Sequence, residues 1–254
     1  KVDKLEMTSV IGSRVDSTSY SRATEVILDW STRRESRYVC AANVHMLMEA
    51  YDSPEYSKII NSADLVTPDG MPLVWMLHLK GNPGQQRVYG PTLMLHILES
   101  AERENVPVGF YGSSPEVLQS LLARMKTRFP NLKVAYSFSP PFQEISQEED
   151  AEIVERINAS SVRILFVGLG CPKQEKWIAK HIKELDIKVA LCIGASVDFV
   201  AGTVVRAPQW MRGIGLEWLY RLLQEPGRLW KRYLVQDMAF LGIFLKRLFK
   251  RKKI

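Results

Sequence analysis

Short apolar runs recur along the first two hundred residues, and amphipathic helical segments separate them. The clearest runs are RYVCAA at 37–42, VRILFVGLG at 162–170 and IKVALCIGAS at 187–196. A strand that is apolar on both faces has to be covered on both sides, which is typical of parallel sheets in α/β proteins. The sequence therefore predicts an α/β body over residues 1–205, with a Rossmann-like, mostly parallel sheet and helices on both faces.

The composition limits the class of protein. Of 254 residues, 46% are hydrophobic and 24% are charged, which excludes disordered and low-complexity classes. No run approaches the roughly 18 apolar residues of a membrane-spanning helix. Cys40, Cys171 and Cys192 stand apart, so we expect neither a disulfide framework nor a structural zinc site. The opening KVDKLEMTSV has no apolar leader core, and we expect a reducing, cytosolic setting.

Positive charge is concentrated at the end of the chain. The whole sequence carries a formal charge of +6, yet residues 206–254 hold twelve lysines and arginines against three acidic residues. The same segment is rich in aromatic residues and leucine. Its longest uncharged run, MAFLGIFL at 238–245, is far too short to span a bilayer.

An apolar stretch with cations crowded at its end suits a helix that lies in the headgroup region of an anionic membrane. We therefore expect residues 206–254 to form a basic, amphipathic helical appendage that associates with the membrane surface. The alternative is a core helix packed on the body. An exposed apolar tail would also favour a homo-oligomer. The candidate membrane-binding residues are Trp230, Phe240, Phe244, Lys246, Arg247 and Lys250.

Polar residues at the carboxyl ends of the predicted strands are candidate site residues, because open parallel sheets bind ligands there. Asp69 follows DLVTP and is either part of an Asp-Gly turn or a general base at the mouth of the sheet. Asn43 follows RYVCAA at a helix start and, taken alone, is better explained as a helix N-cap than as a site residue. Gly168 and Gly170 allow a ligand to approach closely, and the next helix offers free N–H groups to a phosphate.

Basic residues supply candidate phosphate ligands. Arg87 has few acidic neighbours in its loop, PGQQRVYG, so it either clamps a phosphate or is solvated at the surface. In the tail, Arg228, Lys231 and Arg232 share one helical face, and Arg221 precedes them across a proline break. The four histidines show no metal-ligand spacing, and Walker, GxSxG and paired Cys–His signatures are absent, so we expect no metal and no cofactor.

Several segments jointly carry a specific resemblance. They are Ala42-Asn43, NSADLVTPDGMPLVW, QRVYGPTL, FVGLGCPKQEKWI, GASVDFVAG, RAPQWMRGIGLEWLYRLLQEP and GRLWKRYL. Over nearly its whole length the chain resembles the WecG/TagA/CpsF glycosyltransferases, glycosyltransferase family 26. The resemblance implies an inverting, metal-independent enzyme of bacterial surface polysaccharide biosynthesis. It would move a sugar, such as N-acetylmannosamine, its uronic acid or another hexose, from a UDP-sugar to a polyprenyl-diphosphate-linked sugar, as a peripheral protein on the inner face of the plasma membrane.

The resemblance also implies roles for single residues. Asp69 matches the general base, and Asn43 matches a substrate-positioning residue beside it. Ala41 stands where some relatives carry threonine, so one hydroxyl contact to a sugar is missing or replaced. The remaining candidate substrate-binding residues are Arg87, Gly168, Gly170, Gln174, Asp198 near the nucleoside, and Arg221, Arg228 and Lys231 facing a diphosphate.

Two other classes compete with this interpretation. A nicotinamide oxidoreductase is disfavoured because GLGCPK lacks the third glycine of GxGxxG. A non-enzymatic module that binds nucleotide or nucleic acid through the basic tail is permitted by the interleaved aromatic and arginine residues. An apolar run such as MAFLGIFL would not contribute to nucleic-acid binding but would insert readily into a bilayer surface. We therefore expect no nucleic-acid partner.

Overall fold

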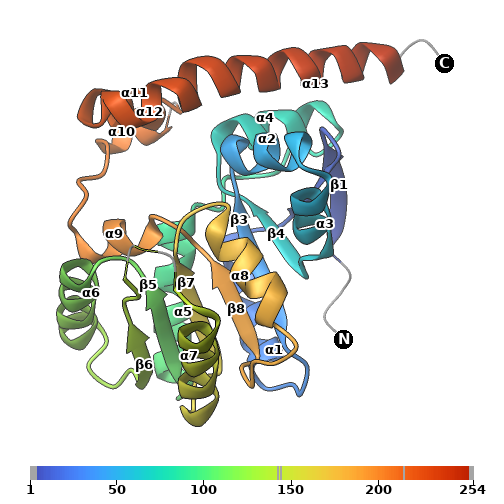
Figure 1. Ribbon diagram of the computed structural model, residues 1–254. Coiled ribbons are helices and arrows are strands. Elements are labelled where there is room, and N and C mark those ends of the chain that lie inside the picture. Colours follow the sequence, from blue (N-terminus) through green and yellow to red (C-terminus); the bar gives the residue numbers. More distant parts are fainter. Residues whose placement is uncertain (1–4, 142, 144, 214, 252–254) are drawn as a thin grey trace.

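The computed structural model describes residues 5–141, 143, 145–213 and 215–251. Within them, six parallel strands form the central sheet in the spatial order β4-β3-β8-β7-β5-β6 (Figure 1). The predicted parallel α/β sheet is confirmed. The strands are β3 (Arg37–Ala42), β4 (Leu65–Pro68), β5 (Val108–Gly112), β6 (Val134–Phe138), β7 (Ile164–Gly168) and β8 (Val189–Cys192).

Helices cover both faces of the sheet, and each face has its own apolar cluster. On β7, for example, Leu165 packs into one cluster and the adjacent Phe166 into the other. This alternation explains why the strands read as continuous apolar runs. One layer contains α2 (Val44–Asp52), α3 (Pro54–Ser62), α4 (Met71–Leu79), α7 (Gln147–Ala159) and α8 (Lys173–His181); the other contains α1 (Tyr20–Ser31), α5 (Gly90–Arg103), α6 (Pro115–Arg128) and α9 (Ser196–Ala201).

Local signals set where several helices begin. Ser53 and Ser114 accept hydrogen bonds from backbone N–H groups in the first turns of α3 and α6, and each is followed by a proline at the first helical position. Ser146 and Glu149 form a reciprocal capping box at the start of α7. These caps fix where α3, α6 and α7 begin.

An N-terminal hairpin extends the fold beyond the predicted sheet. Strands β1 (Glu6–Val10) and β2 (Ser13–Ser17) pair antiparallel, and Gly12 in their turn has a φ of 105°. The buried Asp16 on β2 accepts a hydrogen bond from the Val66 N–H at 2.8 Å, which fastens the hairpin to β4. The sequence analysis did not predict this hairpin.

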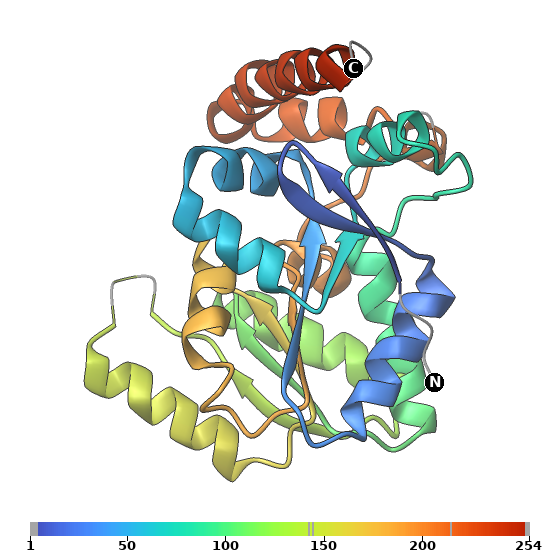
Figure 2. The same ribbon diagram turned by 90° about the vertical axis from the view of Figure 1, so that its right-hand side faces the viewer.

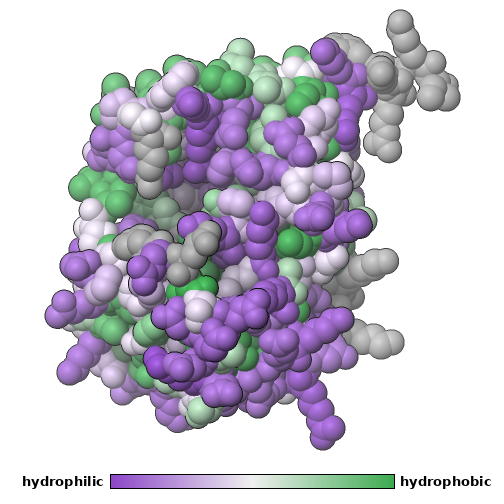
Figure 3. All heavy atoms as spheres, in the orientation of Figure 1, coloured by the Kyte–Doolittle hydropathy of each residue, from purple (hydrophilic) through white to green (hydrophobic). Residues whose placement is uncertain are grey.

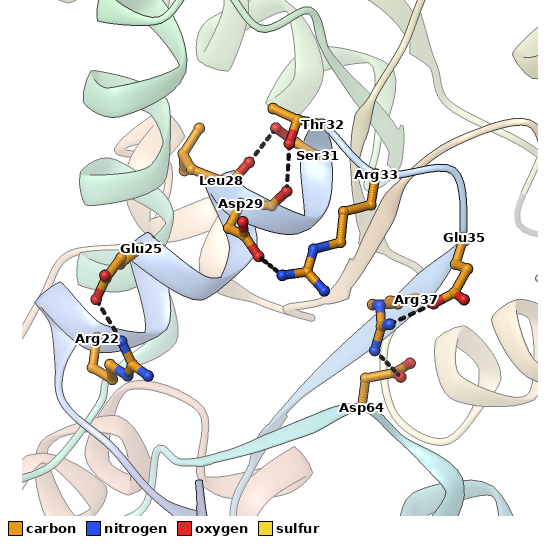
Figure 4. A network of polar contacts seen from close by, with 10 residues as sticks. All are labelled: Arg22, Glu25, Leu28, Asp29, Ser31, Thr32, Arg33, Glu35, Arg37 and Asp64. Carbon is orange, nitrogen blue, oxygen red and sulfur yellow. Dashed lines mark hydrogen bonds and ion pairs between the residues drawn. The ribbon is translucent and has the colours of Figure 1, made fainter. Parts of the chain in front are cut away.

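Polar contacts also fasten the sheet at the end where β3 begins (Figure 4). Arg37 donates to Asp64 at 3.3 Å and to Glu35 at 2.5 Å. Arg33 pairs with Asp29 at 2.5 Å across the last turn of α1. Because ligands of such sheets bind at the opposite, carboxyl end, we assign this network to stability.

The C-terminal segment forms helices that lie across the carboxyl end of the sheet (Figures 1 and 2). Gly215, at a φ of 78°, separates two short helices in the first part of this segment. We call residues 206–251 the appendage; its treatment as a separate domain stays a prediction. Its elements are α10 (Gln209–Gly213), α11 (Glu217–Gln224), α12 (Pro226–Trp230), the π-helical η1 (Lys231–Gln236) and α13 (Asp237–Arg251).

The apolar run of α13 divides between the core and the surface. Phe240 and Phe244 are each 1% exposed and join the apolar cluster of the body. This corrects the expectation that they bind the membrane, since their rings are already packed against protein. The outward face presents Met238, Leu241 and Leu245 instead. Hydrophobic side chains are visible along the upper edge of the molecule, where α13 lies (Figure 3). Among the described residues, no helix combines the length and apolar character needed to cross a bilayer.

Candidate active site

A cavity of about 440 Å³ lies between the carboxyl ends of the strands and the appendage. Figure 3 shows the surface hollowed between these two parts. The strand ends contribute Ala41, Asn43, Asp69, Gly70, Gly170 and Gly194, and the appendage contributes Glu217, Trp218, Arg221, Arg232, Tyr233 and Asp237.

Asp69 is at the mouth of the sheet, directly after β4. Its N–H donates to the carbonyl of Ala42 at 2.8 Å, and its Oδ2 accepts from the Gly90 N–H at 3.2 Å. The carboxylate is 15% exposed and lines the cavity, so it is not sealed in the core. Burial raises the pKa of Asp69; Arg87 and the Gly90 N–H lower it in part, and the nearby Glu217 charge raises it further. A carboxylate with a raised pKa is a better general base than an ordinary one.

Arg87 is held between two carboxylates. Its Nη2 lies 3.3 Å from Asp69 Oδ1, and its Nε donates to the Asp69 carbonyl. Its Nη1 lies 2.6 Å from Glu217 Oε2 on α11, and Tyr89 donates its hydroxyl to Glu217 Oε1 at 3.1 Å. Arg87 is therefore neither a solvated surface residue nor an unpaired phosphate clamp. Its partner, Glu217, is 130 positions away in the chain, which is why the local sequence gave no sign of it.

Asn43 is the N-cap of α2 and also lines the cavity. Its Oδ1 accepts from the Met46 N–H at 3.2 Å, as the capping interpretation predicts. Ala41 contributes only a methyl group to the cavity wall nearby. Any sugar contact that a threonine hydroxyl would make at position 41 is therefore absent here.

Gln174 connects the first turn of α8 to the loop after β8. Its Oε1 accepts from the Gly194 N–H at 3.0 Å, and its Nε2 donates to Glu175 Oε1 at 2.6 Å. The fully buried Glu175 accepts from the Tyr56 hydroxyl at 3.0 Å. Burial raises the pKa of Glu175 to about 7. The chain Tyr56–Glu175–Gln174 thus fixes the amide that lines the cavity.

The appendage brings aromatic and cationic groups to the cavity. The Arg221 guanidinium is 5.3 Å from the Phe199 ring centre, and the Trp218 and Tyr233 rings are 5.9 Å apart. Arg232 also lines the cavity. Glu217, Tyr89 and Asp237 were not among the candidate residues, because only the folded appendage brings them together here.

Three further candidates of the described part of the chain lie outside the cavity. Of the described side chains, Gly168, Asp198 and the exposed Lys231 are not part of its lining. Trp230, Lys246 and Arg247 are exposed on the appendage, and the Arg247 guanidinium is 5.4 Å from the Tyr51 ring centre. The side chains of Arg228 and Lys250 lie outside the described part of the chain.

Metal-ligating residue types are dispersed in the part of the chain that the structure describes, where no three His, Cys, Asp or Glu side chains group as a metal site. The cavity wall instead presents the Asp69 carboxylate, whose pKa is raised, together with arginine guanidinium and side-chain amide groups. These features define an α/β protein with an enzyme-type cleft at the strand ends, closed by a helical appendage.

Residues 8–254 match the family described as Glycosyl transferase WecG/TagA/CpsF. The chain belongs to this family and is a glycosyltransferase.

Curated relatives agree with the family. An N-acetylglucosaminyldiphosphoundecaprenol N-acetyl-beta-D-mannosaminyltransferase of Bacillus spizizenii is 33% identical over 220 residues, covering 87% of this chain and 83% of that protein. A protein of the same name from Staphylococcus aureus strain MW2 is 28% identical over 246 residues, covering 96% of this chain and 92% of that protein. The similarity thus spans body and appendage together.

Proposed function

We propose that this chain transfers an N-acetylmannosamine-type sugar from a UDP-sugar to a polyprenyl-diphosphate-linked sugar, with inversion at the anomeric carbon and without a metal. The observation that carries the proposal is the position of Asp69, a cavity-lining carboxylate with a raised pKa at a strand end. The relatives are named for an N-acetylglucosaminyldiphosphoundecaprenol acceptor and a transferred N-acetylmannosaminyl group. These names support the acceptor and sugar classes proposed here.

In this reaction Asp69 accepts the proton of the acceptor hydroxyl as its oxygen attacks the anomeric carbon. The bond from that carbon to the UDP oxygen breaks, and UDP leaves with the bonding electron pair. Arg221 and Arg232 lie in the cavity wall and would offset the charge of the leaving diphosphate. Arg87 is already paired with Asp69 and Glu217, so its role is to orient Asp69.

The lipid-linked acceptor would require the enzyme to work at a membrane surface, which we propose to be the inner face of the plasma membrane. The exposed Trp230, Met238 and Leu241 supply an apolar surface on the appendage, and the exposed Lys246 and Arg247 supply cations. Flotation with anionic and with neutral vesicles tests this: binding only to anionic vesicles is expected, whereas retention on single-stranded DNA without vesicle binding would favour the nucleic-acid alternative.

The test of the activity is a panel of UDP-sugars offered with a short-chain polyprenyl diphosphate that carries N-acetylglucosamine. The expected result is one added N-acetylhexosamine in the acceptor mass and release of UDP, in buffer with a metal chelator. An unchanged acceptor with every donor would refute the proposal. Activity restored only by added divalent metal would refute its metal-independent part.

A further inference from the structure

Helix α4 is apolar except for the exposed His78, and it faces solvent on one side. Its sequence, MPLVWMLHL, contains no charged residue. Leu73 and Leu77 are fully buried against the body. On the other side, Trp75 is 45% exposed and Leu79 is 58% exposed. Large apolar side chains that lie together at a surface often mark a site for an apolar ligand, and Trp75 and Leu79 form such a pair.

The exposed side of α4 is continuous with the cavity. Met71 and Pro72, at the first turn of the helix, line the cavity directly after Asp69 and Gly70. Met71, Trp75 and Leu79 recur every four residues and therefore share one face of the helix. We call these three residues the α4 stripe. It extends about 12 Å along the helix from the cavity wall.

The appendage borders α4 at both ends. Near its start, Gly215 packs so closely that a Cβ there would lie 3.2 Å from Trp75 Cζ2 and 3.5 Å from Met71 Cγ. Just past its end, Lys80 Nζ is 6.0 Å from the ring centre of Phe244 on α13. The α4 stripe thus begins at the reaction centre and ends beside the helix whose outer face we assign to the membrane.

We propose that the α4 stripe binds the diphosphate-proximal isoprenoid units of the acceptor and leads this chain from the cavity toward the bilayer. The inference rests on the proposed function, since it assumes a polyisoprenoid acceptor. With the acceptor sugar at Asp69, the apolar chain needs a route out of a cavity with polar walls, and Met71 opens such a route. Covering Trp75 and Leu79 also removes apolar surface of the protein from water.

The double variant Trp75→Gln/Leu79→Gln tests this route. The control is Val134→Gln, which changes an exposed apolar residue on the far edge strand β6. Both proteins are assayed with a long-chain acceptor in detergent micelles and with a water-soluble acceptor whose lipid has only a few carbons. We expect KM for the long-chain acceptor to rise about tenfold in the double variant, with KM for the short acceptor, kcat and melting temperature unchanged. The control should match the wild type with both acceptors.

Equal effects on both acceptors, or no effect on either, would overturn the proposal. A defect that appears with acceptor in vesicles but vanishes in detergent would make the stripe a bilayer-docking face instead. A change in mass by light scattering, with both acceptors affected alike, would indicate a contact between copies of the chain.

Photo-crosslinking separates this inference from the proposed function. A polyprenyl diphosphate with a photoreactive group in its first isoprenoid units is irradiated with the wild-type protein, and the modified peptide is identified by mass spectrometry. Label on residues 71–79 supports the route even if no sugar transfer is found. Label confined to other segments overturns it, even if the enzyme is active.

Discussion

Arg87 on the body and Glu217 on the appendage form an ion pair with Nη1 and Oε2 2.6 Å apart. The same guanidinium contacts the carboxylate of Asp69. The electrostatic surroundings of Asp69 therefore depend on a residue that only the seated appendage supplies.

Glu217→Gln should loosen this connection. Glutamine keeps a hydrogen bond to Arg87 but loses the charge, and a charge-assisted hydrogen bond of this kind contributes about 1–3 kcal/mol. We expect faster amide hydrogen exchange in α11 and lower transfer activity. The control is Glu155→Gln, which changes an exposed glutamate on α7. It should leave both the exchange in α11 and the transfer activity unchanged. Exchange in α11 equal to that of the wild type would show that the pair does not hold the appendage.

Asp69→Asn should fold and bind UDP but lose transfer by about a hundredfold or more, the range expected when a general base is removed. Asp186→Asn, on an exposed loop, is the matched control. In the wild type, kcat should fall as the pH drops through the raised pKa of Asp69, because the protonated carboxyl cannot accept a proton. Near-normal turnover in Asp69→Asn would remove it as the base.

Glu175 should make the stability of the fold depend on pH. Its pKa is about 7 in the folded protein because of burial, against an ordinary value of 4.5. The folded state therefore keeps a proton that the unfolded state has released, and the stabilisation is lost as the pH rises from about 4.5 to 7. Relative to Glu175→Gln, the free energy of unfolding of the wild type should fall by up to about 3 kcal/mol across this range. Parallel curves for the two proteins in urea titrations would contradict this.

Phe240→Ala should destabilise the protein by about 3–5 kcal/mol, since the ring is buried in the core. Met238→Ala changes a residue that is 64% exposed on the same helix and should cost less than about 0.5 kcal/mol. Chemical denaturation measures both. Equal, small effects would mean that α13 is not packed on the body as the structure shows.

Replacing Lys246 and Arg247 together by glutamine should weaken binding to anionic vesicles by about 1 kcal/mol per residue. Flotation at low and high salt is the measurement, because the attraction is screened by salt. Lys133→Gln/Lys126→Gln, on the body, is a charge-matched control. If the variant bound anionic vesicles as tightly as the wild type, the positive charge of Lys246 and Arg247 would not contribute to membrane association.

The sequence predicted the parts of this molecule that local chemistry determines. Runs such as RYVCAA are apolar on both faces, and this pattern predicted the parallel strands. The position of Asp69 directly after DLVTP predicted that it lies at the carboxyl end of the sheet. The orientation of α13 was not predictable, because MAFLGIFL is apolar enough to face either protein or lipid. Only the packing of Phe240 and Phe244 on the body decides between them. Glu217 escaped notice for a related reason, since its partner comes from a loop far away in the chain.

A hydrogen bond between His45 and Gln236 joins the appendage to α2, the helix that begins at the cavity. His45 is two residues past Asn43 on α2, and its Nδ1 lies 3.0 Å from Gln236 Oε1 at the end of η1. A shift of η1 would therefore pull on the first turn of α2, beside the cavity-lining Asn43.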